Sequence, residues 1–372
     1  MSAFDVPMEG PNATGDDGAW QADVREGVRN ARDLGRLPLS PRERAVAETA
    51  AARHRVRIPK AYLDLIDWND PADPIRLQVI PSPEELVLEE GELDDPIADH
   101  AFSPVPRLTH RHADRVLLFP TYQCAVYCRY CFRKESLTSI GRGYAREALK
   151  DAYAYIEAHT GIREVILTGG DPLSLPDKAL AEIRERIDAI GHVRLLRIHT
   201  RVPVVLPSRV TAGMVEALQG RLMVTVVTHF NHPREITPAT EQACRALRQA
   251  GFVLLNQSVL LKGVNDRVEV LEELCRELMY RLGVKPYYLH HGDLVPGMAH
   301  RRTTIAEGQA LVRALRERLS GICDPLYVLD LPEGGGKVPL GPSYVEAQDG
   351  RIWRLRGHDG KLRTYVEISE QR

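Results

Sequence analysis

Three cysteines fall within one short segment, Cys124-Ala-Val-Tyr-Cys128-Arg-Tyr-Cys131. Cysteine thiolates hold iron–sulfur clusters, and a [4Fe–4S] cluster normally takes four of them. A compact loop that supplies only three leaves one iron with an open position, where a small molecule can bind and receive an electron. The alternative is a zinc ion with a distant fourth ligand, but structural zinc usually draws on paired C-x2-C elements, and the chain has no second pair. The spacing therefore favours the cluster.

The cysteines follow the first of several short apolar runs that alternate with amphipathic helical patterns. The predicted strands are 115–120, 164–168, 195–199, 223–228, 252–258, 285–290 and 326–330. The predicted helices between them are 146–160, 177–190, 212–218, 238–250, 268–281 and 305–319. Such alternation specifies a parallel sheet with right-handed crossovers. With six or seven units, a closed or partly closed (β/α) barrel is favoured over an open doubly wound sheet.

Residues whose side chains could bind a ligand or take part in a reaction lie where these strands end. Besides the cysteines they are Gly169-Gly170-Asp171, Arg201, His229, Asn256, Gln257, Asp293, Asp330 and Lys337. In barrels the active site forms at the carboxyl ends of the strands, so these side chains should meet at one mouth. Taken without the cysteines, the glycine pair is better interpreted as an ordinary strand-to-helix turn. The shared position of the whole set favours an enzyme.

The chain before the barrel has a different character. It has no strand alternation, and short helices are predicted over 21–34, 41–54 and 60–67, separated by proline and glycine. Residues 71–97 are proline-rich and acidic, which is typical of a linker or wrapping segment. The predicted organisation is a disordered polar N-terminus (1–18), a helical extension with its linker (19–107), the barrel (108–322) and a C-terminal segment (323–372).

Composition narrows the class of protein. Of 372 residues, 44% are hydrophobic and 27% are charged, so a large core can form. The net charge of −2 gives no reason to expect a nucleic-acid partner. The N-terminus lacks the features of a secretory signal, and no apolar stretch is long enough to span a membrane. The expectation is a cytoplasmic protein. The isolated Cys244, Cys275 and Cys323 are expected to be buried as small hydrophobic residues.

The C-x3-C-x2-C spacing after the first barrel strand resembles the signature of the radical S-adenosylmethionine (SAM) superfamily. Leu167-Thr-Gly-Gly-Asp-Pro is similar to its second element, whose backbone and carboxylate meet the methionine amino group. Further segments from about Leu108 to Val345 closely resemble the lysine 2,3-aminomutase family: 108–118, 131–134, 199–207, 256–266, 286–293 and 328–337. This resemblance implies a partial (β/α)6-type, TIM-like radical SAM barrel with a helical N-terminal extension and a C-terminal segment that carries a PLP lysine.

The resemblance also implies an isomerase with three cofactors: a [4Fe–4S] cluster, SAM and pyridoxal 5′-phosphate (PLP). L-Lysine would become β-lysine through hydrogen abstraction by a 5′-deoxyadenosyl radical and migration of the amino group. A flavodoxin- or ferredoxin-type reductant and a homo-oligomeric assembly are expected with it.

Particular residues acquire roles through the same resemblance. Lys337, after Gly334-Gly-Gly, would hold PLP as a Schiff base. A Walker-type phosphate loop is a weak alternative, because Val338 stands where a serine or threonine should be. Arg111 and Arg115 would lie near the PLP phosphate, although a solvated basic turn remains open for one of them. Gly169, Gly170 and Asp171 would contact SAM, and Gln257 would line the cofactor face or serve as a core amide.

Substrate recognition is expected from three charged residues. Arg133 would pair with the α-carboxylate, and Asp293 with Asp330 would bind the remote ammonium group of lysine. Two acidic residues favour a cationic side chain over glutamate, but arginine stays open as a substrate, as does a desaturase outcome. A non-catalytic iron–sulfur or zinc protein is the lowest-ranked alternative.

The chain departs from the clostridial members of the family in two respects. No cysteine follows Cys323, and Arg267 stands where another ligand of their intersubunit zinc would be, so no zinc is expected. His290-His291-Gly292 replaces the usual aromatic residue before the aspartate, and Glu333 interrupts a glycine loop. These changes bear on the substrate pocket.

Overall fold

The structure is a computed structural model that describes residues 18–139, 144, 146–357 and 359–368. The N-terminus predicted to be disordered, residues 1–18, therefore lies outside the described residues except for Gly18. Elsewhere most predicted elements are present, and several match to the residue. No helix within the described ranges is long and apolar enough to cross a membrane.

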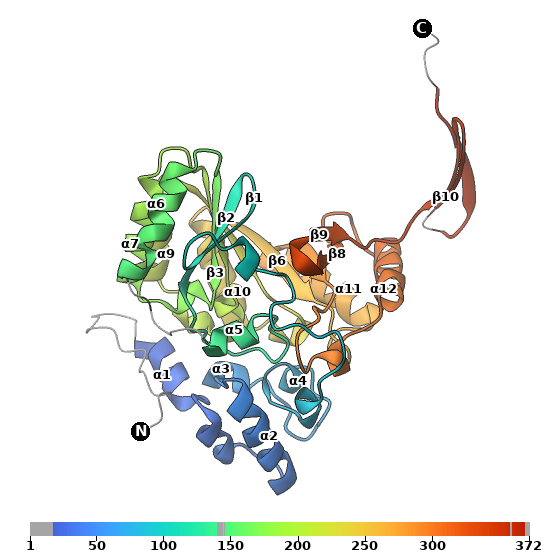
Figure 1. Cartoon of the computed structure of the whole chain (residues 1–372). Coiled ribbons are helices and arrows are strands. Elements are labelled where there is room, and N and C mark those ends of the chain that lie inside the picture. Colours follow the sequence, from blue (N-terminus) through green and yellow to red (C-terminus); the bar gives the residue numbers. More distant parts are fainter. Residues whose placement is uncertain (1–17, 140–143, 145, 358, 369–372) are drawn as a thin grey trace.

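The centre of the molecule is a nine-stranded sheet in which the strands follow one another in chain order from β1 to β9 (Figure 1). Seven strands run parallel: β2 (Arg115–Thr121), β3 (Glu164–Gly169), β4 (Leu195–His199), β5 (Met223–Thr228), β6 (Val253–Val259), β7 (Lys285–His290) and β8 (Leu326–Leu331). β1 (Leu108–His112) and β9 (Gly336–Pro339) are antiparallel additions at the two edges. The sheet ends at these strands rather than closing, which confirms the predicted partial barrel.

Helices follow most of the parallel strands and cover the outside of the sheet. They are α6 (Lys150–Ala158), α7 (Asp177–Asp188), α9 (Ala212–Leu218), α10 (Pro238–Gln249), α11 (Val268–Glu277) and α12 (Ile305–Arg318). Capping boxes begin α10 at Thr237 and α12 at Thr304, where side-chain oxygens satisfy free amide groups. Cys244, Cys275 and Cys323 are buried and free, as expected.

The N-terminal extension (residues 19–107) lies beneath the barrel and contributes α1 (Gly18–Glu26), α2 (Pro41–Arg53), α3 (Lys60–Leu63) and α4 (Arg76–Val79) (Figure 1). The prediction of one helix over 21–34 is wrong. α1 ends at Glu26 because Gly27 lies against another segment, where a Cβ atom would come within 2.2 Å of the Ile58 carbonyl oxygen. Val28 then pairs with Ile58 in an antiparallel bridge. A contact with a distant segment thus overrides local helical periodicity.

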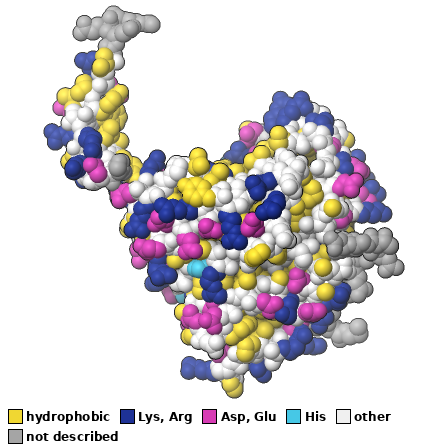
Figure 2. Space-filling view, turned by 180° about the vertical axis from the view of Figure 1, so that it is seen from behind, with side chains coloured by type: hydrophobic (Ala, Val, Ile, Leu, Met, Phe, Trp, Pro, Cys, Tyr) yellow, Lys and Arg dark blue, Asp and Glu magenta, His cyan; other side chains and the backbone are white. Residues whose placement is uncertain are grey.

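Beyond the barrel, a three-stranded antiparallel sheet projects from the body of the molecule (Figures 1 and 2). Its strands are β10 (Val345–Asp349), β11 (Ile352–Arg356) and β12 (Leu362–Val366), none of which the sequence patterns predicted. Apolar and polar residues alternate only weakly along these strands, because both faces of the sheet are largely exposed. The exposed residues include the apolar Ile352, Leu362 and Tyr365. An apolar–polar period arises only where one face is buried.

Candidate active site

One cavity of about 560 Å³ lies within the barrel and has the size of a site for small molecules. All the residues to which the resemblance gives a role line it: Arg111, Arg115, Cys124, Cys128, Cys131, Arg133, Gly169, Gly170, Asp171, Gln257, Asp293, Asp330 and Lys337. Asn256 does not line it. The three cysteines belong to one wall, and Lys337 reaches the cavity from the edge strand β9. The fold therefore brings together residues that lie more than 200 positions apart.

The loop that carries the cysteines, residues 122–133 (the cysteine loop), begins directly after β2. Burial raises the pKa of the Cys131 thiol to about 11 and the pKa of Cys124 well above its usual value. Thiolates here therefore need a positive partner such as iron. The three cysteines line the same cavity, and a cluster that uses one thiolate per iron fits this donor set.

The N-terminal extension braces the cysteine loop from behind. The Tyr127 amide donates to the carbonyl of Arg57 at 3.1 Å, and the Arg129 amide donates to the carbonyl of Gln78 at 2.9 Å. The Arg129 guanidinium also donates to the Glu85 carboxylate, through Nε at 3.0 Å and through Nη2 at 2.5 Å. Both side chains of this ion pair are at least 95% buried.

Replacing Glu85 by glutamine is expected to lower the free energy of unfolding by about 3–5 kcal/mol, because it leaves the Arg129 charge buried without its partner. Denaturant unfolding of the purified protein measures this change. Asp64→Asn is the matched control, since it breaks an exposed ion pair with Lys60, and exposed pairs contribute little to stability. Equal losses in the two variants would refute the bracing role.

Gly169 and Gly170 are required by packing. Gly169 has a φ of +108°, and a Cβ atom at Gly170 would lie 2.2 Å from the Gln123 carbonyl oxygen. The Asp171 carboxylate accepts hydrogen bonds from the Thr200 hydroxyl at 2.7 Å and from the Arg201 amide at 2.7 Å. These contacts join the strand end to the cysteine loop and to the loop after β4. A role in binding SAM stays a prediction.

Two of the predicted arginines share a carboxylate that the sequence patterns did not reveal. Asp99 accepts from Arg111 Nη2 at 3.2 Å and from Arg133 Nε at 3.0 Å, and its side chain is mostly buried. Arg133 also donates to the Thr168 hydroxyl at 3.3 Å. Arg115 instead pairs with its neighbour Asp114. Asp99 follows the proline-rich segment, and only the fold places it beside the cavity.

Lys337 is the direct cross-strand partner of Asp330, in the antiparallel pair of β9 with β8. Its ammonium group contacts the Asp330 carboxylate and lies 3.4 Å from His290 Nδ1. Burial alone would raise the pKa of Asp330, but the hydrogen bond to His290 and the charge of Lys337 hold it below its usual value. Burial and the nearby Asp330 raise the pKa of Asp293 to about 7. The two carboxylates therefore differ in their affinity for protons.

A polar group at the carboxyl ends of β4, β5 and β6 consists of His199, His229 and Gln257. The Gln257 side-chain amide lies 3.5 Å from His199 Nδ1 and 3.3 Å from His229 Nε2. Burial lowers the pKa of His229 to about 3, so its imidazole is neutral near pH 7. Asn256 faces the core, where its amide group bonds to Phe230. Of the two amides, only Gln257 therefore belongs to the cavity.

Comparisons with known proteins agree with this geometry. A model of the radical SAM superfamily matches residues 118–275, and a model of lysine-2,3-aminomutase matches residues 312–371. An L-lysine 2,3-aminomutase of Clostridium subterminale is 41% identical over 94% of this chain and 84% of its own length. A putative L-lysine 2,3-aminomutase of Aquifex aeolicus is 40% identical over 94% of both chains. A glutamate 2,3-aminomutase of Clostridioides difficile is 36% identical over 88% of this chain and 77% of its own. The chain therefore belongs to the lysine 2,3-aminomutase family within the radical SAM superfamily.

Proposed function

We propose that this protein is a PLP-dependent radical SAM aminomutase that converts L-lysine to β-lysine. The observation that carries the proposal is a cavity lined by the three cysteines, by Lys337 and by both Asp293 and Asp330. A cluster protein that only transfers electrons has no need for an enclosed amine and two carboxylates beside its cluster. The family membership supports an isomerase.

The residues present fit the family's cofactors. Cys124, Cys128 and Cys131 would bind the [4Fe–4S] cluster, and the segment after β3 would bind SAM. Lys337 would bind PLP, with the guanidinium groups of Arg111 and Arg115 on the same cavity for its phosphate. When bound, the cluster with SAM supplies a 5′-deoxyadenosyl radical, and PLP carries the migrating amino group.

The charged side chains can orient an amino acid with a cationic end. Arg133 presents a forked donor to the α-carboxylate, and Asp99 and Thr168 hold that fork in place. The Asp330 carboxylate contacts the Lys337 ammonium group, and Asp293 lines the same cavity. If Lys337 held PLP, Asp330 would be available to bind the remote ammonium group of the substrate together with Asp293.

Anaerobic incubation with SAM, PLP, dithionite and one amino acid at a time tests the proposal. The products are separated by chromatography before mass spectrometry, because lysine and β-lysine have the same mass. Conversion of L-lysine to β-lysine, with glutamate unchanged, is the expected result. Conversion of arginine instead would reassign the substrate, since a guanidinium also pairs with two carboxylates. A product two mass units lighter than lysine would indicate a desaturase. No product and no deoxyadenosine from any amino acid would refute the enzyme.

The pKa of Asp293, about 7, predicts a pH dependence of substrate capture. Below that pH the carboxyl group is protonated and neutral, and above it the negative carboxylate attracts a cation. The ratio kcat/KM for lysine is therefore expected to rise up to about tenfold between about pH 6 and pH 8. Asp293→Asn should remove this rise. Asp330→Asn should lower kcat/KM, because a carboxylate is lost, and should move the rise to lower pH, because the charge of Asp330 helps to raise the pKa of Asp293. A flat profile for the unaltered enzyme would contradict the role of Asp293.

The partners beyond the amino acid follow from the same proposal. A flavodoxin- or ferredoxin-type protein would donate the electron that reduces the cluster. This reductant, the homo-oligomeric assembly and the cytoplasmic location stay predictions. Reduction assays with candidate carriers and light scattering of the purified protein would test the first two.

A further inference from the structure

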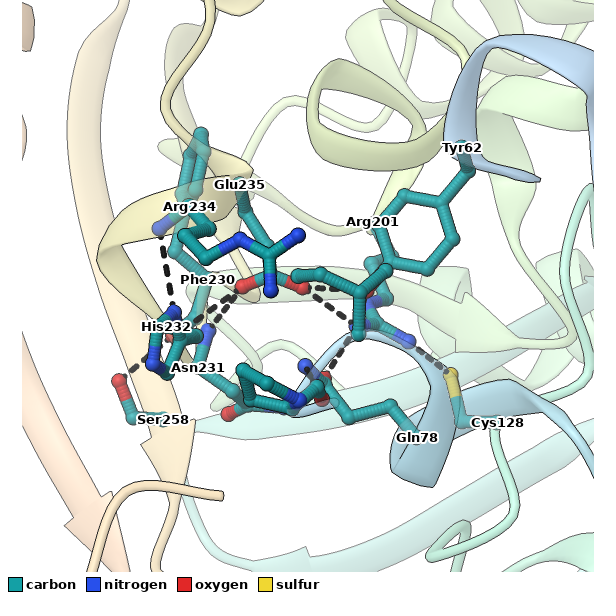
Figure 3. Close-up of polar contacts among 12 residues, drawn as sticks. Tyr62, Gln78, Cys128, Arg201, Phe230, Asn231, His232, Arg234, Glu235 and Ser258 are labelled. Carbon is teal, nitrogen blue, oxygen red and sulfur yellow. Dashed lines mark hydrogen bonds and ion pairs between the residues drawn. The ribbon is translucent and has the colours of Figure 1, made fainter. Parts of the chain in front are cut away.

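Arg201 occupies an unusual place for a cation, because its side chain is 95% buried directly beside the cysteine loop. It follows β4, and its backbone amide holds Asp171. Its Nη1 donates to the sulfur of Cys128 at 2.9 Å. Figure 3 shows the guanidinium surrounded by Cys128, Tyr62, Gln78 and Glu235, with Glu235 across from Cys128. The cation is therefore built into the wall that would carry the cluster.

The second nitrogen of the fork fixes the orientation of the group. Nη2 of Arg201 donates to the Gln78 side-chain oxygen at 2.6 Å and to Glu235 Oε1 at 2.7 Å, and it lies 2.8 Å from the Tyr62 hydroxyl. The Tyr62 hydroxyl itself donates to Glu235 Oε1 at 2.6 Å. Tyr62 belongs to α3 and Gln78 to α4, so the N-terminal extension supplies two of these three partners of Nη2. Because the guanidinium is planar, fixing Nη2 also fixes the direction of Nη1.

The carboxylate of Glu235 balances the positive charge of Arg201, so Arg201 does not need Cys128 as a counter-charge. Glu235 is fully buried, and its second oxygen accepts the amides of Asn231 at 2.5 Å and His232 at 2.9 Å (Figure 3). Glu235 therefore neutralises Arg201 and is itself fully hydrogen-bonded. A buried pair costs desolvation and is weak evidence for a purely stabilising role. Nη1, in contrast to Nη2, donates to the sulfur of Cys128, one of the proposed cluster ligands.

We propose that Arg201 is a positioning residue for Cys128 that donates a hydrogen bond to the cluster-bound sulfur and raises the reduction potential of the cluster, and that the N-terminal extension sets its orientation through Tyr62 and Gln78. The inference rests on the cluster of the proposed function. Hydrogen bonds to sulfur and nearby positive charge stabilise the more negative, reduced state of an iron–sulfur cluster. Electron transfer from a mild reductant to the cluster thereby becomes more favourable.

The test is a redox titration of the anaerobically reconstituted full-length protein, followed by electron paramagnetic resonance, with iron content measured in parallel. Arg201→Met is expected to keep the cluster but to lower the ratio of reduced to oxidised cluster at a fixed potential about tenfold, which is a one-electron shift of about 59 mV. Arg201→Lys should give a smaller shift, since it keeps the charge and loses the fork. Tyr62→Phe, which leaves the cysteine loop untouched, should shift the ratio in the same direction by less.

Arg209→Met is the matched control. Arg209 is equally buried and ion-paired, with Asp177 at 2.6 Å, but it does not line the cavity. Its potential should equal that of the unaltered protein. A fully iron-loaded Arg201→Met with an unchanged potential, or an equal shift in Arg209→Met, overturns the inference. If Arg201→Met fails to hold iron, an unchanged potential in Tyr62→Phe overturns it. If the unaltered protein takes up no cluster, the proposed function fails as well, and iron content separates the two failures.

Discussion

Serine at any one of Cys124, Cys128 or Cys131 is expected to end the cleavage of SAM. Each thiolate would hold one iron, and the loop offers no spare sulfur, so loss of one ligand dismantles the centre that starts the reaction. Deoxyadenosine formation should fall to the uncatalysed background, a loss of about 10⁶-fold or more, because the whole rate enhancement depends on that centre. Iron content, absorbance of the reconstituted cluster and deoxyadenosine yield measure the effect.

Cys244→Ala provides the control for the cysteine variants. Cys244 is fully buried in α10 and does not line the cavity, so its loss removes a thiol and leaves the cluster ligands in place. This variant should keep its iron and its activity, with a modest loss of stability from the smaller side chain. Loss of the cluster in Cys244→Ala, or a full cluster in any of the three serine variants, would show that the ligands are assigned wrongly.

Lys337→Arg is expected to abolish PLP binding and turnover while it keeps a cation opposite Asp330. A guanidinium stays protonated and cannot form a Schiff base, whereas the lysine amine can. Treatment of the PLP-loaded protein with borohydride should attach about one PLP per chain, and peptide mapping should place it on Lys337. Lys337→Arg should show no label and no conversion of lysine.

Lys285→Arg tests whether the label is specific. Lys285 is a half-buried lysine on β7 whose ammonium donates to the carbonyls of Pro286 and Asp324, and it does not line the cavity. Its arginine variant should retain the label at Lys337 and should retain activity. Borohydride label on any other lysine of the unaltered protein would contradict the assignment, even if the enzyme proved to depend on PLP.

The local sequence predicted the barrel well because each of its elements carries its own signal. A strand that is buried on both faces has a continuous apolar sequence. In the helices that cover the sheet, the apolar residues recur with a period of 3.6. β4, β5, β7 and α9 accordingly begin and end where the patterns place them. The cysteine spacing and the residues at strand ends are also local features. For this reason the sequence alone could predict the cysteines, the two aspartates and Lys337 as residues of one site.

Only the tertiary structure decided how those side chains are held, because their partners come from segments that have no pattern of their own. Asp99 joins two arginines from beyond a proline-rich stretch, and Lys337 meets Asp330 only because β9 turns back along β8. Tyr62 and Gln78 reach Arg201 from more than 120 residues earlier in the chain. Spacing along the chain reports which residues can share a loop or a helix face. Burial and charge compensation between distant segments, which orient the catalytic groups, exist only once the chain has folded.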